Sequence, residues 1–425
     1  MSKQVTIVVA AFLALALACA GDDGPTSTPD DSPTASPSTT APSPTSPAPT
    51  ESLSTTPTSS PLGGRPLGQL LTPTDIIDST AEPFAGYIAN VDTGQLWSVD
   101  WLGTWSPDGA YIAISSCCID GDLIVIDVAT GEGRLLVEGN INGFAWSPDS
   151  RNIAFTYAIN AGGSDGLHLV APDSGLVTKV GDAPRSWGLT WLPGGDFIAV
   201  IEPSTRDIVL VEVATGAETR IAVSSSLHSW SPDGLTLAYI ADDVLYVYDR
   251  ITGESAVTLD GVGSGVPRWS PDGDRLLIPY GDPIDYPSSP NAEHWVPHVL
   301  TLGGDSDPVA LTPGIFTSWS PDGREVLVER FGCVTGDWDV LTFETDGSSP
   351  TNHTNTPDVI EEGPAFSPDG SMIAYSTFTE IRVLDLETGE NRTLAEGSRL
   401  HFHGLWSPDS STIAFSVGGD HGICT

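Results

Sequence analysis

The sequence predicts an all-β fold, a β-propeller of eight four-stranded blades, and two observations lead to it. An aromatic residue followed by Ser-Pro-Asp-Gly, or by a close variant, recurs along the chain at separations of 39 to 50 residues. Between these motifs lie short runs of β-branched and aromatic residues bounded by Gly and Asp, and no stretch has helical periodicity. Short strands that repeat in sets of four at such a period build the blades of a propeller.

Composition and charge limit the functions that this fold can serve. The chain has 425 residues, of which 56 are acidic and 16 basic, so its formal net charge is −40. A surface this negative repels phosphate backbones, and we expect no nucleic-acid partner. A chain of this length is too long for one compact core unless repeats build it, and a hydrophobic content of 39% supports a sizeable folded domain.

Residues 1–18 have the features of an export signal. Lys3 supplies a positive start, and the apolar run that follows is too short to span a bilayer as a mature helix. Small residues lead directly to Cys19, an arrangement that resembles the lipobox of bacterial lipoproteins. We therefore predict an extracytoplasmic protein that is attached to the bacterial cell membrane only through a lipid on Cys19. The alternative is ordinary cleavage after Ala18 or Ala20, which gives a secreted protein.

Residues 19–83 are predicted to be a disordered tether. Between residues 21 and 66 the chain is almost entirely Pro, Ser, Thr, Asp and Gly, without apolar periodicity. Such a segment cannot bury enough surface to offset the entropy of ordering it. An O-glycosylated stretch has the same composition, and in either case the segment is a linker to the domain at 84–425.

The repeated motif is a turn preceded by an aromatic wedge. Ser, Pro, Asp and Gly in this order favour a type I turn with a bulge, and the large ring before it suits packing between neighbouring sheets. Ser150 and Ser410 replace the Gly, which is expected to strain the backbone by about 1 kcal/mol. The aromatic anchors are Trp105, Trp146, Trp191, Trp230, Trp269, Trp319, Phe366 and Trp406.

The remaining strands of a blade follow each turn. Residues 111–114 and 123–126 are β-branched or aromatic, the turn Ala129-Thr130-Gly131 comes next, and residues 134–137 form a short fourth run. The same order recurs in the later repeats. The last repeat ends after a second strand at 412–417, and Gly86–Val99 matches its missing third and fourth strands. The N-terminal hairpin is therefore predicted to close the ring, which removes open sheet edges.

The Trp-Ser-Pro-Asp-Gly turn, the Ile-Ala-Phe strand and the Asp-x-x-Thr-Gly turn resemble TolB-type, WD-like β-propeller repeats over roughly residues 84–425. This resemblance implies a ring of four-stranded blades that acts as a scaffold for protein contacts in the bacterial cell envelope. Similar repeats occur in prolyl oligopeptidase-like enzymes and in some polysaccharide lyases. Eight motifs give eight blades, and seven remain possible if the degenerate copy at Trp191 or a terminal piece forms none.

Cysteine and histidine residues give two weaker expectations. Because neighbouring blades meet when the ring closes, Cys424 is predicted to form a disulfide with Cys117 or Cys118, the alternative being free thiols or a bond between the vicinal pair. His401 and His403 alternate on one strand and are the weak candidates for a metal site. We otherwise expect no metal, no cofactor and no catalytic set.

The residues four positions before the aromatic anchors lie near the start of each innermost strand. Trp101, Trp187, Glu362 and Phe402 depart from one another there, so they are the candidate binding residues; alternatively, the rings plug the centre of the ring. The predicted function is non-catalytic binding of a protein or cell-wall ligand by a monomeric scaffold. The alternatives are a metal-dependent enzyme such as a polysaccharide lyase, and a sensory or adhesive module with a cationic partner.

Overall fold

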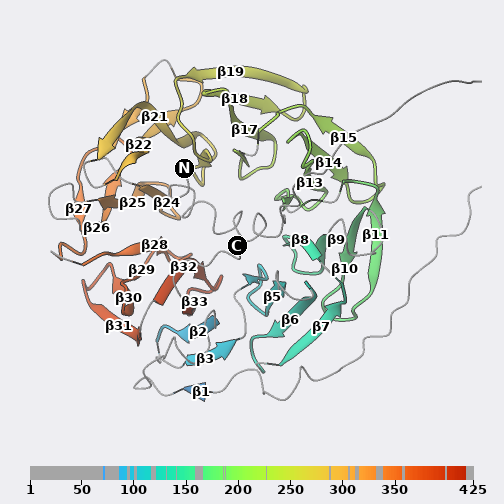
Figure 1. Cartoon of the computed structure of the whole chain (residues 1–425), viewed down its shortest axis with the longest axis horizontal. Coiled ribbons are helices and arrows are strands. Elements are labelled where there is room, and N and C mark those ends of the chain that lie inside the picture. The colour runs from blue at the N-terminus through green and yellow to red at the C-terminus, as the bar shows by residue number, and fades with distance from the viewer. Residues whose placement is uncertain are drawn as a thin grey trace, which may run out of the picture.

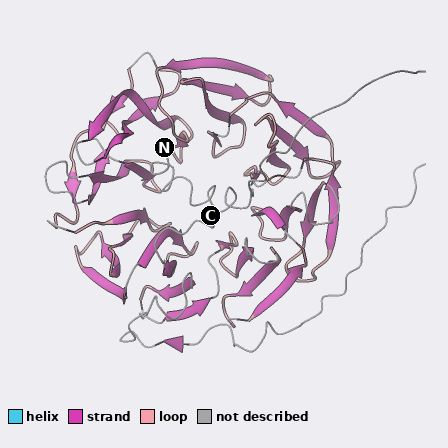
Figure 2. Cartoon of the chain, viewed as in Figure 1, coloured by secondary structure: helices cyan, strands magenta, loops and turns pink. Residues whose placement is uncertain are grey.

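Eight β-sheets form a closed ring (Figure 1). A computed structural model describes residues 70–71, 86–92, 96–99, 103–115, 121–130, 132–139, 141–157, 166–184, 186, 188–225, 227–286, 289–304, 307–311, 315–331, 338–356, 359–397 and 400–417. In this part of the chain every regular element is a strand and none is a helix, as Figure 2 shows. The predicted all-β propeller of eight blades is therefore confirmed.

Blades one to four follow one another along the chain, each with its strands antiparallel and in sequence order. Blade one contains β4 (Thr104–Trp105), β5 (Tyr111–Ser115), β6 (Leu123–Asp127) and β7 (Gly133–Val137). Blade two contains β8 (Ile141–Trp146), β9 (Ile153–Tyr157), β10 (Leu167–Val170) and β11 (Val177–Gly181). Blade three contains β12 (Leu189–Trp191), β13 (Phe197–Ile201), β14 (Ile208–Glu212) and β15 (Glu218–Ile221). Blade four contains β16 (His228–Trp230), β17 (Thr236–Ala241), β18 (Val244–Asp249) and β19 (Glu254–Asp260).

Blades five to seven repeat this order, and the middle strands of blade five are the longest in the molecule's described part. Blade five contains β20 (Arg268–Trp269), β21 (Arg275–Tyr286), β22 (Ser289–Thr301) and β23 (Val309–Ala310). Blade six contains β24 (Ile315–Trp319), β25 (Glu325–Phe331), β26 (Trp338–Glu344) and β27 (Thr351–Asn352). Blade seven contains β28 (Glu362–Phe366), β29 (Met372–Ser376), β30 (Glu380–Asp385) and β31 (Asn391–Glu396).

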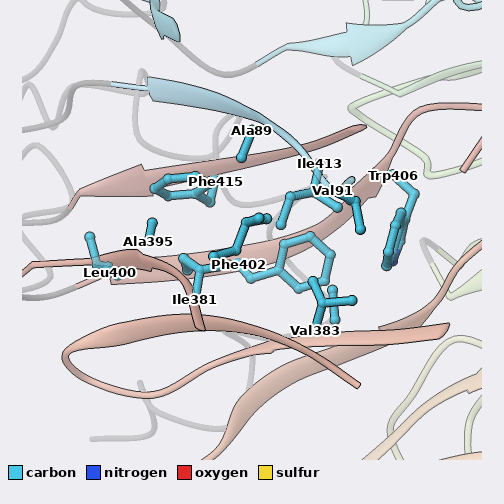
Figure 3. Packing of buried hydrophobic residues seen from close by; sticks show 12 residues of the cluster. Ala89, Val91, Ile381, Val383, Ala395, Leu400, Phe402, Trp406, Ile413 and Phe415 are labelled. Carbon is cyan, nitrogen blue, oxygen red and sulfur yellow. The ribbon is translucent and has the colours of Figure 1, made fainter. Parts of the chain in front are cut away.

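Blade eight closes the ring with strands from both ends of the chain. It contains β32 (Leu400–Trp406), β33 (Thr412–Val417), β2 (Gly86–Asn90) and β3 (Leu96–Val99). β2 pairs with β33 from Gly86 opposite Ser416 to Asn90 opposite Thr412, so the predicted closure by the N-terminal hairpin is confirmed. Figure 3 shows side chains from both ends, among them Ala89, Ile413 and Phe415, packed in one cluster.

A fifth strand, β1 (Leu70–Leu71), extends blade eight by pairing with β3. These two residues lie inside the segment 19–83 that the sequence assigns to a linker, so part of that segment contributes a strand to the sheet. The predicted signal at 1–18 and the other linker residues lie outside the described residues. The described part of the chain contains no candidate for a membrane-spanning helix.

The ring has eight blades rather than seven because the degenerate turn after Trp191 still folds. Leu192 N donates to Phe197 O at 3.0 Å and Gly195 N donates to Leu192 O at 2.8 Å. These are the backbone bonds that Ser106 makes in blade one. The backbone alone therefore forms the turn, and the Ser and Asp side chains add to it.

Where the motif is complete, its serine and aspartate lock the turn. Ser106 Oγ donates to Asp108 Oδ1 at 2.7 Å and accepts from Tyr111 N at 2.9 Å. Both bonds recur at the other complete or Ser-ended copies, which begin at Ser147, Ser231, Ser270, Ser320, Ser367 and Ser407. Hydrogen bonding from these serines lowers the pKa of the turn aspartates, for example that of Asp149.

Two serines in place of the motif glycine are compensated by bonds between blades. Ser150 and Ser410 have φ of 61° and 62°, a region that favours glycine. Ser150 Oγ accepts from Asp108 N of the previous blade at 3.0 Å, and Ser410 Oγ accepts from Asp369 N at 3.1 Å. The strain that the sequence predicts at these positions is thus offset by a contact that glycine cannot make.

Five of the anchor tryptophans join their blade to the one before it. Trp146 Nε1 donates at 3.0 Å to the carbonyl of Thr104, the residue that precedes the anchor of blade one. The same bond joins four more pairs of blades, at 3.0 to 3.2 Å: Trp191 to Ala145, Trp269 to Ser229, Trp319 to Arg268 and Trp406 to Ala365. The rings are the wedges that the sequence predicts, and their N–H groups fix the register between blades.

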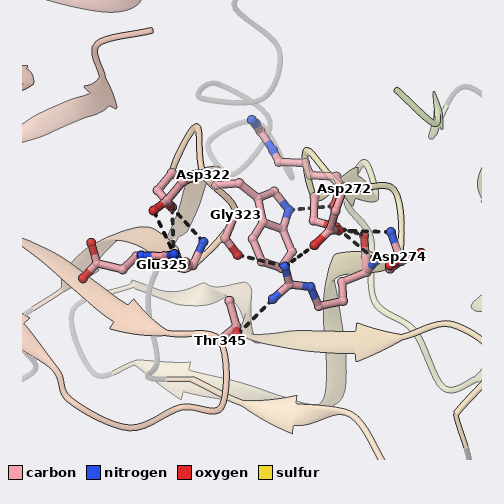
Figure 4. A network of polar contacts seen from close by, with 12 residues as sticks. Asp272, Asp274, Asp322, Gly323, Glu325 and Thr345 are labelled. Atoms are coloured by element: carbon pink, nitrogen blue, oxygen red, sulfur yellow. Dashed lines mark hydrogen bonds and ion pairs between the residues drawn. The ribbon is translucent and has the colours of Figure 1, made fainter. Parts of the chain in front are cut away.

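An arginine adds a further link between blades five and six. Arg275 Nη1 donates to Thr345 Oγ1 at 3.0 Å, and Nη2 donates to Gly323 O at 2.9 Å. Figure 4 shows these partners beside Asp272, whose carboxylate also accepts from Nη2. The guanidinium carbon lies 5.2 Å from the centroid of the Trp319 ring, within the range of a cation–π contact.

Candidate ligand-binding site on blade seven

The two faces of the ring carry different connections. The motif turns, such as 367–370 in blade seven, lie on the face that we call the turn face. The strands of a blade are antiparallel, so two other features of each blade lie on the opposite face, which we call the upper face. They are the start of the innermost strand and the loop between the blade's second and third strands. In blade seven these upper-face residues are 359–362 and 377–379.

A hollow of about 450 Å³ lies on the upper face of blade seven. Its walls come from the connection between blades six and seven with the start of β28, from β29, β30 and the turn between them, and from Asn391 at the start of β31. This volume is within the range of about 300–1,000 Å³ that is usual for ligand pockets. We call it the blade-seven hollow; its lining residues are Thr356, Val359, Ile360, Glu361, Glu362, Tyr375, Thr377, Phe378, Thr379, Glu380, Arg382 and Asn391.

A bulge in the innermost strand places Glu362 at the rim of the hollow. Glu362 lies opposite Ser376, but the register shifts before Ala365, so the strand is irregular between them. Ser376 Oγ donates to Glu362 O at 3.1 Å and holds this backbone, while the Glu362 side chain is exposed. Bulges of this kind re-aim side chains next to binding sites.

Two further carboxyl groups lie behind Glu362. Glu361 is 1% exposed and accepts a hydrogen bond from Thr356 Oγ1. Glu329, from β25 of blade six, is 2% exposed and accepts from Gly363 N at 3.0 Å. Burial, reinforced by the charges of Glu362 and Glu361, raises the pKa of Glu329 to about 8. Glu329 is therefore predominantly a neutral acid at neutral pH.

Only glycine fits at the junction between these acidic residues and blade eight. Gly363 has φ of +62°, and a Cβ atom there would lie 2.5 Å from Phe402 O. The close approach lets the Gly363 N–H reach Glu329 Oε2 while its Cα faces β32. Blades six, seven and eight are thus in contact directly below the rim.

A polar network forms one wall of the hollow. Asn391 Nδ2 donates to Tyr375 Oη at 2.7 Å, and Arg382 Nε donates to Asn391 Oδ1 at 3.3 Å. Arg382 Nη1 also donates to Glu380 Oε2 at 2.8 Å, and both side chains are less than one third exposed. The guanidinium is therefore held by groups of its own blade, which makes this wall rigid.

Two exposed apolar side chains border the opening. Ile360 is 44% exposed and Phe378 is 60% exposed. The other exposed large apolar side chains in the described part of the chain are Leu176, Leu235, Ile251 and Val257. Two of six therefore line a single hollow, which is the combination of apolar surface and placed polar groups that is typical of ligand sites.

Of the four predicted binding residues, Glu362 lines the hollow. Phe402 is 3% exposed and packs edge-to-face on Trp406 with ring centroids 6.5 Å apart (Figure 3). Its ring packs in the hydrophobic cluster between blades seven and eight and exposes little surface there. Trp101 and Trp187 lie outside the described residues.

The other predicted sites are not described by the structure. Cys19, Cys117, Cys118 and Cys424 fall outside the described residues, and so does the disulfide predicted between them. The backbones of His401 and His403 lie in β32, but their side chains are not among those described. Among the described side chains, no group of three or more His, Cys, Asp or Glu is placed to hold a metal ion.

Sequence reasoning missed most of the hollow. It singled out Glu362 by its distance from the motif, but the lining residues Phe378 and Arg382 come from the following loop and from β30, whose positions the motif does not predict. The signal that was available is Thr377-Phe378-Thr379, because none of blades one to six has an aromatic residue between its second and third strands. Glu329 carried no signal, because its contact with Gly363 joins residues 34 positions apart.

Comparisons with known proteins identify the fold and no closer relationship. No protein-family model matches the chain, and no curated protein matches its sequence. Dihydro-heme d1 dehydrogenase NirN in complex with DHE matches with a TM-score of 0.53 and 17% identity, over 77% of this chain and 76% of that chain. An oligogalacturonate lyase in complex with manganese matches with a TM-score of 0.48 and 14% identity, over 74% and 98%.

TolB proteins are also among the solved structures that match. The structure of a putative TolB from Agrobacterium tumefaciens has a TM-score of 0.36 and 18% identity, over 79% of this chain and 98% of that chain. The chain is a β-propeller. TolB-type propellers, which the motifs resemble, are thus among the structures that the chain matches, and the propeller fold itself rests on the eight sheets of the ring.

Proposed function

We propose that this protein is a non-catalytic binding propeller that captures a protein or cell-wall ligand on the upper face of blade seven. The observation that supports this function is the blade-seven hollow, where exposed Ile360 and Phe378 border a rigid polar wall. The turn face, in contrast, repeats one hydrogen-bonded turn from blade to blade. In a repeat protein, a specific binding surface forms where the repeats differ from one another. Aromatic side chains at such a surface frequently contribute much of the binding free energy.

Affinity capture with matched variants tests this function. Immobilised full-length protein is incubated with detergent extracts of native membranes, and the retained partner is quantified. The double variant Ile360→Ser, Phe378→Ser should lose the partner. The double variant Ile251→Ser, Val257→Ser removes apolar side chains that are 73% and 67% exposed on blade four, and it should retain the partner.

Three results would count against the function. If both double variants retain as much partner as the wild-type protein, the ligand binds elsewhere. If both lose the partner, the capture reflects nonspecific binding to exposed apolar side chains. Turnover of an acidic polysaccharide by the purified protein with a divalent metal would replace binding by the enzymatic alternative. Circular dichroism and melting temperature close to the wild-type values show that the variants are folded.

We further propose that the propeller acts at the outer face of the bacterial cell membrane, held by a lipid on Cys19. The support is the apolar run before Cys19 and the Pro-rich segment after it, which would act as a tether. Cys19→Ser should move the protein from the membrane fraction to the soluble fraction. Wild-type protein that is soluble after export would instead support the secreted alternative.

A further inference from the structure

Charge distinguishes the blade-seven hollow from a plain apolar patch. Glu361, Glu362 and Glu380 line it against a single guanidinium, that of Arg382. Arg382 is engaged with Glu380 at 2.8 Å and with Asn391 at 3.3 Å, so its position is fixed by its own blade. A ligand that enters the hollow therefore meets an excess of negative charge.

The carboxylates lie at two depths. Glu361 is 1% exposed and belongs to the deep part of the lining, whereas Glu362 is exposed at the rim. Glu329 lies beneath them and accepts a hydrogen bond from Gly363 N. Burial raises the pKa of Glu329 to about 8, so this carboxyl group is mostly uncharged at neutral pH. The negative potential is therefore directed at the opening, where Glu362 meets the solvent.

The apolar rim complements this charge in a specific way. Phe378 and Ile360 border the same opening as Glu362, so a ligand that satisfies all three must combine a cation with an aliphatic stem. Arginine and lysine side chains have this composition, and a guanidinium or ammonium group is also attracted to the face of a phenyl ring. Small inorganic cations would leave the apolar rim uncovered.

We propose that the blade-seven hollow is the docking site of a basic peptide segment of a partner protein. This inference rests on the proposed binding function and names the ligand's chemistry. One arginine or lysine of the segment enters the hollow with its cation toward Glu362 and Glu361 and its stem against Phe378. The neighbouring residues of the segment lie over Ile360. The net charge of −40 steers such a segment toward the protein and makes its association depend on salt.

Fluorescence anisotropy with defined peptides tests the proposal. The probe is a fluorescein-labelled hexapeptide of alternating arginine and alanine, with both ends blocked, and it is titrated with full-length protein at about 0.1 M ionic strength. In a control peptide citrulline replaces each arginine, which keeps the shape and removes the charge. We expect the arginine peptide to bind and the citrulline peptide to bind at least tenfold more weakly, since citrulline cannot form charged hydrogen bonds with the carboxylates.

Two charge-matched variants locate the site. Glu362→Gln should weaken binding of the arginine peptide roughly tenfold, because it removes a carboxylate at the rim. Glu254→Gln, on the exposed strand β19 of blade four, changes the net charge equally and should leave the affinity within about twofold, because surface charges are screened over about 10 Å. Phe378→Ser should also weaken binding without changing its dependence on salt.

Several outcomes overturn the proposal. If Glu254→Gln weakens binding as much as Glu362→Gln, the peptide is held by the overall charge. If blocked argininamide binds as tightly as the peptide, the site takes a small cation and not a peptide. If the arginine peptide fails to bind while the Ile360→Ser, Phe378→Ser variant still loses its captured partner, the cationic ligand is wrong and the binding function stands. If that variant retains its partner as well, both fall.

Discussion

Replacing Trp269 and Trp230 by phenylalanine tests how indole hydrogen bonds hold the blades together. Trp269 Nε1 donates to Ser229 O at 3.1 Å, whereas Trp230 Nε1 is buried with no hydrogen-bond partner among the described residues. The two rings occupy equivalent anchors in adjacent blades and are both partly buried. Blade seven already has a phenylalanine anchor, Phe366, so the propeller accommodates phenylalanine at this position.

The expected magnitudes differ although the substitution is the same. Trp269→Phe removes a hydrogen bond between two blades, a loss of about 1 kcal/mol. Trp230→Phe removes a buried N–H donor that has no partner, which stabilises the folded state by about 1–3 kcal/mol. This gain offsets the packing that the smaller phenyl ring loses. We therefore expect Trp269→Phe to be less stable than Trp230→Phe by at least about 1–2 kcal/mol.

Urea unfolding followed by tryptophan fluorescence, together with calorimetry, measures the difference. The unfolding entropy is about 2.1 cal/mol/K per residue for roughly 330 folded residues. A difference of about 1–2 kcal/mol in the free energy of unfolding therefore corresponds to a difference of roughly 1.5–3 °C in melting temperature. Trp230→Phe should melt at or above the wild-type temperature. Equal losses for both variants would show that ring volume decides the stability and that the indole hydrogen bonds do not.

Three further predictions concern the core and the turns. The folded-state pKa of Glu329 is raised from 4.5 to about 8, so its contribution to stability is fully present below pH 4.5 and is lost as pH rises through 8. Glu329→Gln should remove this decline from the pH dependence of the free energy of unfolding, and an unchanged pH profile would contradict the prediction. Ser150→Ala should cost about 1 kcal/mol in urea unfolding by removing the bond to Asp108 N, whereas Ser150→Gly should be nearly neutral because it also relieves the positive φ; the reverse order would refute the compensation. Deleting residues 86–99 should cause aggregation on size-exclusion chromatography, since it exposes the edge of β33, and a monomeric, folded product would argue against closure by this hairpin.

Much of the fold could be predicted because its determinants are local. The motif Ser106-Pro107-Asp108-Gly109 forms its bonds within six residues, so each copy specifies its own turn without help from the rest of the chain. Its eight copies give the number of blades. The closing hairpin was predictable from what the last repeat lacks, because an open sheet edge is costly and Gly86–Val99 supplies the two missing strands.

The candidate site was less predictable because its contacts are not local. Glu329 and Gly363 come from different blades, and the pKa of Glu329 depends on burial that no pattern in the sequence reveals. Phe402 has the same spacing from its motif as Glu362, yet its ring is buried in the cluster between blades seven and eight. Spacing predicts the position of a residue along a strand but not the environment around its side chain.

Hydrogen–deuterium exchange tests the central claim, that the ligand binds at the upper face of blade seven, most directly. The full-length protein is measured alone and with the partner recovered by capture. The account predicts slower exchange in residues 359–362 and 377–382, which border the hollow, and unchanged exchange in the motif turns at 106–109 and 367–370. Protection confined to the turn face, or to the exposed outer strand β19, would contradict it.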